Sequence, residues 1–117
     1  MINFAHNLQI YLYRKPVDFR KQIDGLVLLI CDHLKRNPTD GQMYLFRNRG
    51  GNKLKLLYYE RGGFWLCYRR LERGRFIFPE VLDSTVLINQ DQLQWLLSGL
   101  DYQHFEPRGD KRYQYFH

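Results

Sequence analysis

Side chains that could bind a metal or act as a nucleophile are scattered along this sequence. The chain of 117 residues holds four histidines and two cysteines, and none of them has the close spacing of zinc ligands. Cys31 and His33 come nearest, but two residues along a helix turn the chain by about 200°, so this pair diverges. We therefore expect no metal site and no bound cofactor. Cys31 and Cys67 each lie in an apolar segment, where a cysteine usually behaves as a small buried hydrophobe.

Acidic and hydroxyl side chains offer no better basis for catalysis. Two-metal nucleotidyl transfer needs carboxylates that converge on metal ions about 4 Å apart. Asp18 and Asp24 would diverge around a helix, and Asp18 and Asp32 would stand about 21 Å apart along it. Neither serine has a nucleophile-elbow motif, and the glycine turn at residues 49–53 lacks the phosphate-loop pattern. We expect no catalytic residues and no enzyme activity.

Positive charge, by contrast, is concentrated in one quarter of the chain. Eighteen Lys and Arg against twelve acids give a net charge of +6. Between Arg47 and Arg75 there are nine bases and two acids, Glu60 and Glu72, so this stretch carries +7 and the remainder −1, which is +6 minus +7. Such a concentration favours an acidic partner, although a solvated charged face explains the charge alone equally well. The candidate nucleic-acid contacts are Arg47, Arg49, Lys53, Lys55, Arg69, Arg70, Arg73 and Arg75.

Aromatic side chains are interleaved with these cations. Tyr59 and Trp65 are the candidates for stacking on bases or for packing in an interface. Half of the aromatic residues in this stretch must belong to the core of any sheet, which weakens the stacking interpretation.

The elements that must position these residues can be predicted from periodicity. Residues 8–13 alternate as in a short strand. Asp18 is a good N-cap, and an apolar stripe with helical spacing follows it, which predicts a helix over Asp18–Leu34. Four β-rich runs, at 42–48, 53–60, 63–71 and 75–78, are separated by turn sequences.

Both faces of the central β-rich runs carry apolar residues. One helix can cover one face, so the other must meet the chain ends, a second subunit or a partner. Residues 81–88 are expected to be irregular or a short strand. Asn89 with Gln92 resembles a capping box, which predicts a second helix near 90–100.

The expected fold is therefore α+β: an antiparallel β-meander of four to five strands packed against an N-terminal amphipathic helix, with a second short helix near the C-terminus. Residues 1–105 would form the single domain, and 106–117 a loosely held tail. A composition that is 44% hydrophobic and 16% aromatic argues against disorder. The longest apolar run, residues 25–31, is far shorter than the about 20 residues of a membrane span. With no visible signal peptide, we expect a cytoplasmic protein without membrane contact.

Several segments also carry a family resemblance, and the block from Arg69 to Pro79 is its most specific part. The other segments are Ile10–Leu12, Pro16–Lys21, Asp24–Leu26, Phe46–Arg47, Lys55–Tyr59, Gly63–Tyr68, Gln92–Leu93 and Leu96–Asp101. Together they resemble the TnpB accessory proteins, products of the second open reading frame, of the insertion sequence 66 family of bacterial transposable elements. The resemblance spans roughly residues 8–102.

This resemblance implies a non-catalytic accessory protein of transposition, because in this family a separate, larger protein carries the transposase carboxylates. The implied partners are DNA at the element ends and the transposase of the same element, and a homo-oligomer is possible. The alternative is a purely protein-binding or oligomerising module with no DNA contact.

The matching segments include two further cations, Arg20 and Lys21. At a helix start they oppose the helix macrodipole, which makes them interface candidates. A salt bridge to Glu60 or Glu72 would explain them equally well.

Overall fold

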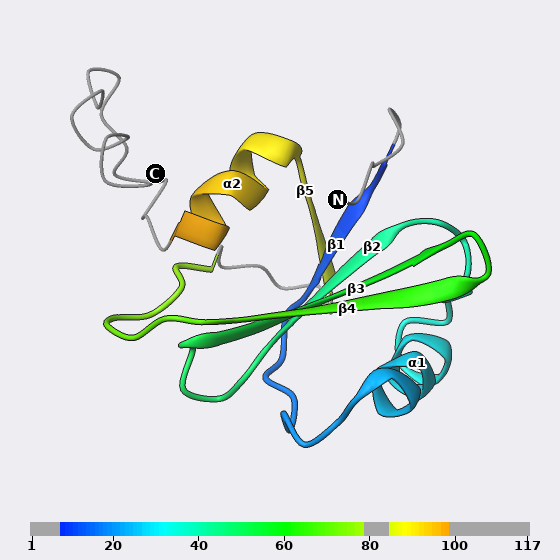
Figure 1. Cartoon of the computed structure of the whole chain (residues 1–117), viewed down its shortest axis with the longest axis horizontal. Coiled ribbons are helices and arrows are strands. Elements are labelled where there is room, and N and C mark those ends of the chain that lie inside the picture. Colours follow the sequence, from blue (N-terminus) through cyan, green and yellow to red (C-terminus); the bar gives the residue numbers. More distant parts are fainter. Residues whose placement is uncertain (1–7, 79–84, 99–117) are drawn as a thin grey trace.

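The computed structural model describes residues 8–78 and 85–98, and a five-stranded mixed sheet lies at its centre (Figure 1). The strands are β1 (Ile10–Tyr13), β2 (Met43–Arg47), β3 (Lys53–Glu60), β4 (Gly63–Arg70) and β5 (Thr85–Ile88). Their order across the sheet is β4-β3-β2-β1-β5. β2, β3 and β4 are antiparallel neighbours, whereas β1 runs parallel to β2 and antiparallel to β5.

The α+β class is confirmed, but the expected all-antiparallel meander is wrong. A parallel neighbour cannot be reached by a tight turn and needs a longer crossover. Helix α1 (Ile23–Asp32) lies in the connection from β1 to β2 and makes this crossover. Helix α2 (Gln90–Ser98) follows β5.

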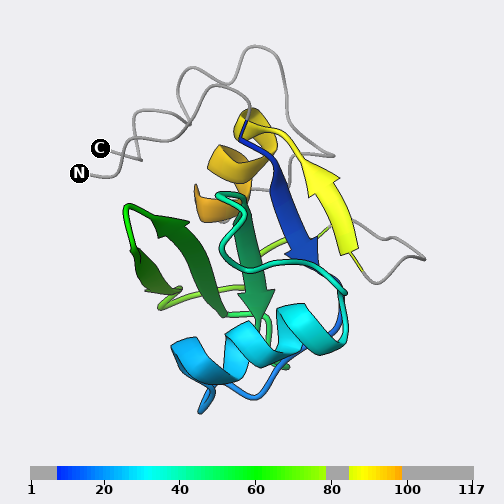
Figure 2. The same cartoon turned by 90° about the vertical axis from the view of Figure 1, so that its right-hand side faces the viewer.

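The two helices cover opposite faces of the sheet (Figures 1 and 2). On the α1 face, Leu26 and Ile30 pack with buried side chains of β2 and β3 such as Phe46. On the α2 face, Leu93 and Leu96 belong to a second buried cluster. Because both faces are covered, β2 and β3 bury side chains at successive positions rather than at alternate ones.

Helix α1 begins at Ile23 rather than at the predicted Asp18. Asp18 instead forms a local turn: its Oδ1 accepts the backbone N–H of Arg20 at 2.9 Å, and its Oδ2 accepts the Arg20 Nη2 at 2.6 Å. Aspartate side chains compete with helices in this way. The N-cap is Gln22, whose side chain makes no capping hydrogen bond. Cys31 is exposed on this helix, and Cys67 is exposed on β4, so neither is the buried hydrophobe that the sequence predicted.

The expected strand at residues 75–78 is not formed. The segment after β4 crosses the α2 face of the sheet, where Phe76 is buried and Phe78 packs beside it. The backbone N–H of Phe76 donates to the carbonyl of Gly51 at 2.8 Å, a single bond rather than a ladder. This segment therefore helps α2 to cover the core.

Helix α2 begins with the predicted capping box. The N–H of Gln92 donates to Asn89 Oδ1 at 2.8 Å, and the N–H of Asn89 donates to Gln92 Oε1 at 2.9 Å. The short strand expected within 81–88 is β5, while residues 81–84 and the predicted tail at 106–117 lie outside the described part. Over residues 8–78 and 85–98, no helix is both long and apolar enough to span a bilayer.

Lys55 is a buried charged residue on the inner strand β3, with 2% of its surface exposed. Its Nζ donates to the carbonyl oxygens of Phe19 at 2.9 Å and Lys21 at 2.6 Å, and lies 4.9 Å from the Phe19 ring centroid. Burial lowers the pKa of Lys55. The ammonium thereby ties the segment before α1, which has no side-chain cap, to β3.

Replacing Lys55 by Met keeps the side-chain length but removes the donor to both carbonyls. We expect the Lys55→Met variant to lose about 1–3 kcal/mol of unfolding free energy, because buried acceptors would be left without partners. Urea denaturation followed by circular dichroism measures this. Lys53→Met is the matched control on the same face of β3, and it should change stability by no more than about 0.5 kcal/mol. Equal losses of unfolding free energy in the two variants would contradict an anchoring role for the Lys55 ammonium.

Candidate nucleic-acid interface

The strand directions bring several separate segments to one end of the sheet. β1 and β2 are parallel and end there, so β3 begins there and β4 ends there. Each of these strand ends carries cations. We call this group the basic end; its members are Arg14, Lys15, Arg47, Arg49, Lys53, Arg69, Arg70, Arg73 and Arg75.

Backbone hydrogen bonds fasten the β2–β3 turn to the segment that follows β4. The N–H of Leu71 donates to Asn52 O at 2.8 Å, and Phe76 is held by Gly51 in the same way. Gly51 has a φ of +75°, and a Cβ on it would stand 3.7 Å from the side chain of Arg75. The turn that carries Arg49 and the loop that carries Arg73 therefore lie side by side, at the left of Figure 1.

Like charges meet across the ladder at this end. Lys53 and Arg70 are directly paired residues of β3 and β4, on the α1 face. Two cations in such a position destabilise a sheet. The charge of Arg70 is offset by Glu72, whose carboxylate accepts a hydrogen bond from the Arg70 guanidinium at 2.8 Å, and both side chains are exposed to solvent. Arg69 lies exposed on the opposite face of β4. An anion bound here would relieve the repulsion.

Arg47 holds the basic end together rather than presenting its charge outward. Its Nε and Nη2 donate to the carbonyl oxygen of Arg14 at 3.0 and 2.6 Å, and its guanidinium lies 4.9 Å from the centroid of the Phe78 ring. Burial lowers the pKa of Arg47, and the neighbouring Arg14 cation lowers it further. The role of this residue is therefore to join the end of β1 to β2.

Three of the candidates from the sequence are not brought to this surface. Lys55 faces the core, as described above. Tyr59 and Trp65 lie towards the other end of the β3–β4 hairpin. They point to opposite faces of the sheet, because Tyr59 pairs with Phe64, and Trp65 is the next residue of β4 after Phe64. Trp65 is 46% exposed, yet four residues of strand, about 13 Å, separate it from Arg69. Stacking by these aromatic rings is therefore not part of the basic end.

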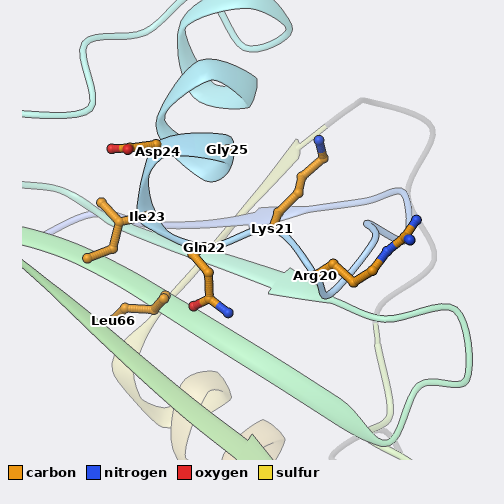
Figure 3. A pocket seen from close by; sticks show the side chains of 7 residues that line it. All are labelled: Arg20, Lys21, Gln22, Ile23, Asp24, Gly25 and Leu66. Atoms are coloured by element: carbon orange, nitrogen blue, oxygen red, sulfur yellow. The ribbon is translucent and has the colours of Figure 1, made fainter.

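Arg20 and Lys21 line an open pocket between the start of α1 and β4, together with Leu66 (Figure 3). The figure shows both cations extending to one side of the pocket and Asp24 to the other. Arg20 pairs with Asp18 instead of either glutamate considered from the sequence. These two residues flank the α1 face and are separate from the turn and loop described above.

Arg14 and Lys15 belong to the basic end but lie outside the sequence window from 47 to 75. A count of charge along the chain misses them because only the parallel pairing of β1 with β2 places them beside Arg47. The sequence feature that could have identified them is a pair of cations directly after the first predicted strand and before Pro16.

Within residues 8–78 and 85–98, no three His, Cys, Asp or Glu side chains are grouped to hold a metal ion. What the described part presents instead is a small α+β protein whose distinctive surface is a cationic sheet end. This chain belongs to the family described as IS66 Orf2 like protein, whose match covers residues 8–107. The resemblance seen in the sequence is thus confirmed, and the family links the chain to insertion-sequence transposition as an accessory protein.

Two relatives come from Sinorhizobium fredii (strain NBRC 101917 / NGR234), and both are named as uncharacterized proteins. The protein y4hO is 35% identical over 104 residues, which cover 89% of this chain and 90% of that protein. The protein y4jC is 33% identical over 112 residues, covering 96% of each. No solved structure matches this chain.

The contact between Arg20 and Asp18 can be tested by titration. The Arg20 side chain is the main cause that lowers the pKa of Asp18 from 3.8 to about 2, with Lys21 a weaker one. Arg20→Gln should raise this pKa part of the way towards 3.8, because the backbone N–H of residue 20 still donates to Asp18, whereas the control Lys21→Gln should move the pKa much less. Carbon NMR of the carboxyl group measures both.

The sign of the pH effect follows from the same shift. A carboxyl group whose pKa is lower in the folded state stabilises the fold above the unfolded value and stops doing so as the pH falls towards the folded value. The contribution of Asp18 should therefore be complete above about pH 4–5 and vanish near pH 2. An unchanged pKa of Asp18 in Arg20→Gln would disprove the contact.

Proposed function

We propose that this chain is a non-catalytic accessory protein of insertion-sequence transposition that binds DNA through its basic end. The observation that carries the proposal is the convergence of cations from β1, β2, β3 and the loop after β4 at one end of the sheet. Two carboxylates lie near this surface, and each is already bonded to an arginine: Glu72 to Arg70, and Asp18 to Arg20.

Such a surface suits the phosphate backbone of a duplex. Each lysine or arginine that neutralises a phosphate releases condensed counterions, which gives affinity without requiring contact with the bases. Arg49, Arg69, Arg73 and Arg75 are exposed and can reach phosphates, while Arg47 and Lys55 support the scaffold. Contacts of this kind position a protein on DNA and do not by themselves read sequence. Any preference for the element ends would need additional contacts with base edges.

No catalytic role is included in this proposal. The described histidines, cysteines and carboxylates form no group that could hold a metal ion, and the acids nearest the basic end are engaged with arginines. The chain would act by holding DNA, the transposase, or both.

The alternative is a protein-binding module without DNA contact. The exposed side chains of Trp65 and Tyr68, at 46% and 53% of their surface, favour it. Binding of the transposase through these rings would depend little on salt and would be lost in Trp65→Ala, because buried aromatic side chains dominate protein interfaces. Binding through the basic end would weaken strongly as salt increases and would survive Trp65→Ala.

Salt dependence of DNA binding is the decisive measurement. Fluorescence anisotropy with a labelled duplex of an element's terminal repeat, and with a scrambled duplex, should give a log–log salt slope of about −4 or steeper, as expected for four or more phosphates. Tighter binding of the terminal repeat than of the scrambled duplex would add sequence readout. No binding at about 50 mM salt would overturn the proposal.

A charge-matched pair of variants locates the surface. Arg69→Glu with Arg73→Glu removes two cations of the basic end and should make the salt slope shallower by about 2, because two phosphate contacts are lost. Lys35→Glu with Arg61→Glu makes the same change in net charge at the opposite end of the sheet and should leave the slope unchanged. Circular dichroism should show that both variants are folded. Equal weakening in the two would assign binding to net charge rather than to this surface.

A further inference from the structure

Strand β4 forms a long edge of the sheet. It has eight residues, pairs with β3 on one side, and has no strand on its other side among the described residues. The other edge strand, β5, has four residues. An exposed strand edge is a template for pairing with another strand.

Natural edge strands usually carry features that prevent such pairing, and the middle of β4 lacks them. Its middle, residues 64–68, has no charged residue and no proline. The strand pairs with β3 residue for residue, so it contains no bulge. Charged side chains, proline and bulges are the common protections. The edge is therefore shaped for a partner strand rather than against one.

The turn before β4 determines which backbone groups point outward. Arg61 and Gly62 have φ values of 50° and 80°, as in the two-residue turns that join hairpin strands. Glu60 and Gly63 then form the closing hydrogen-bonded pair, and bonding alternates along the strand. The N–H and C=O groups that face away from β3 belong to Phe64, Leu66, Tyr68 and Arg70.

We propose that β4 pairs with β4 of a second copy of this chain, antiparallel and centred on Cys67, so that two sheets become one of ten strands. Antiparallel pairing brings the outward groups of Leu66 opposite those of Tyr68 from the second copy. Cys67 then stands opposite Cys67. Because Trp65, Cys67 and Arg69 point to one face of β4, Trp65 meets Arg69 of the second copy on that face.

The second copy is chosen because β4 is complementary to itself. Its aromatic residues Phe64 and Trp65 come first, and its cations Arg69 and Arg70 come last. Reversal of the strand sets each cation across from an aromatic ring, an arrangement in which arginine is attracted to the ring face. It also keeps like charges apart. An antiparallel pairing centred on residue 66 or 68 would also match the outward N–H and C=O groups of the two strands. It would not place Trp65 opposite Arg69.

This pairing does not rest on the proposed DNA contact. The basic ends of the two copies would lie at opposite ends of the joint sheet, and Arg69 and Arg70 are the members of the basic end that would also contact the second copy. Loss of DNA binding in Arg73→Glu, which lies outside β4, would leave the pairing intact, and loss of the pairing in Trp65→Lys would leave the cations in place.

Cysteine cross-linking tests the register. In an antiparallel pair centred on Cys67, the two Cys67 residues form a non-hydrogen-bonded pair with Cα atoms about 4.5 Å apart, which lies within the range of a disulfide. With Cys31→Ser, diamide oxidation should produce a covalent dimer through Cys67. With Cys67→Ser, the chain should stay monomeric on a denaturing gel, although Cys31 on α1 is also exposed. Cross-linking through Cys31 alone, or through neither cysteine, would overturn the proposal.

Charge exchange tests the contact between Trp65 and Arg69. Sedimentation without DNA should show a dimer for the wild-type chain, and Trp65→Lys should weaken it by roughly tenfold or more, because the introduced ammonium would face the Arg69 guanidinium of the second copy. Trp65→Lys with Arg69→Glu should restore the dimer. Leu28→Lys is the matched control, since Leu28 is 60% exposed on α1, away from the edge.

The remaining outcomes decide against the second copy. A wild-type chain that stays monomeric at about 100 μM would overturn the pairing with a second copy. A dimer that Leu28→Lys disrupts as strongly as Trp65→Lys would place the contact elsewhere. Circular dichroism of each variant establishes that a monomer is folded.

Discussion

β1 and β2 run in the same direction, and the gathering of Arg14 and Lys15 beside Arg47 follows from that pairing. A parallel neighbour requires a crossover, and α1 lies in it, which commits one face of the sheet to α1 and leaves the other for α2. The same pairing makes two strand ends coincide. An antiparallel β1 would have carried Arg14 and Lys15 to the far end of the sheet, away from Arg47.

The two lysines of β3 show how two similar side chains on one face can have different roles. Lys53 lies at the start of the strand, where solvent and the neighbouring Arg70 surround it. Lys55, two residues on, reaches beneath the chain that leads into α1 and donates to carbonyls there. That segment precedes a helix without a side-chain cap, so the lysine supplies from the sheet an anchoring contact that the helix start does not provide.

Much of the local structure could be predicted from sequence, because it depends on neighbours along the chain. The capping box of Asn89 and Gln92 is one example, and the antiparallel order of β2, β3 and β4, joined by short turns, is another. The start of α1 could not be predicted in this way. An aspartate can bond a neighbouring backbone N–H in a turn as well as cap a helix, and here Asp18 bonds Arg20 while Lys55 binds the carbonyls of Phe19 and Lys21 in the same segment.

The candidate surface could be predicted only in part, for a related reason. Charge along the sequence identified the cations between 47 and 75 but gave neither their faces nor the burial of Lys55. Strand register decides those properties, and register depends on contacts between distant segments. The same holds for residues 75–78, whose alternating aromatic pattern favours a strand while burial of Phe76 holds them across the α2 face instead.

The place of β1 inside the sheet also determines the order in which the protein can be completed. β1 comes from the beginning of the described chain, but one of its neighbours is β5, and Ile10 pairs with Ile88. A growing chain can form the local hairpins of β2, β3 and β4 early, since their contacts are close in sequence. One side of β1 must wait until residues 85–88 leave the ribosome. Synthesis therefore passes through a stage in which β1 is itself an open strand edge, and closing that edge requires the longest-range strand pairing of the described sheet.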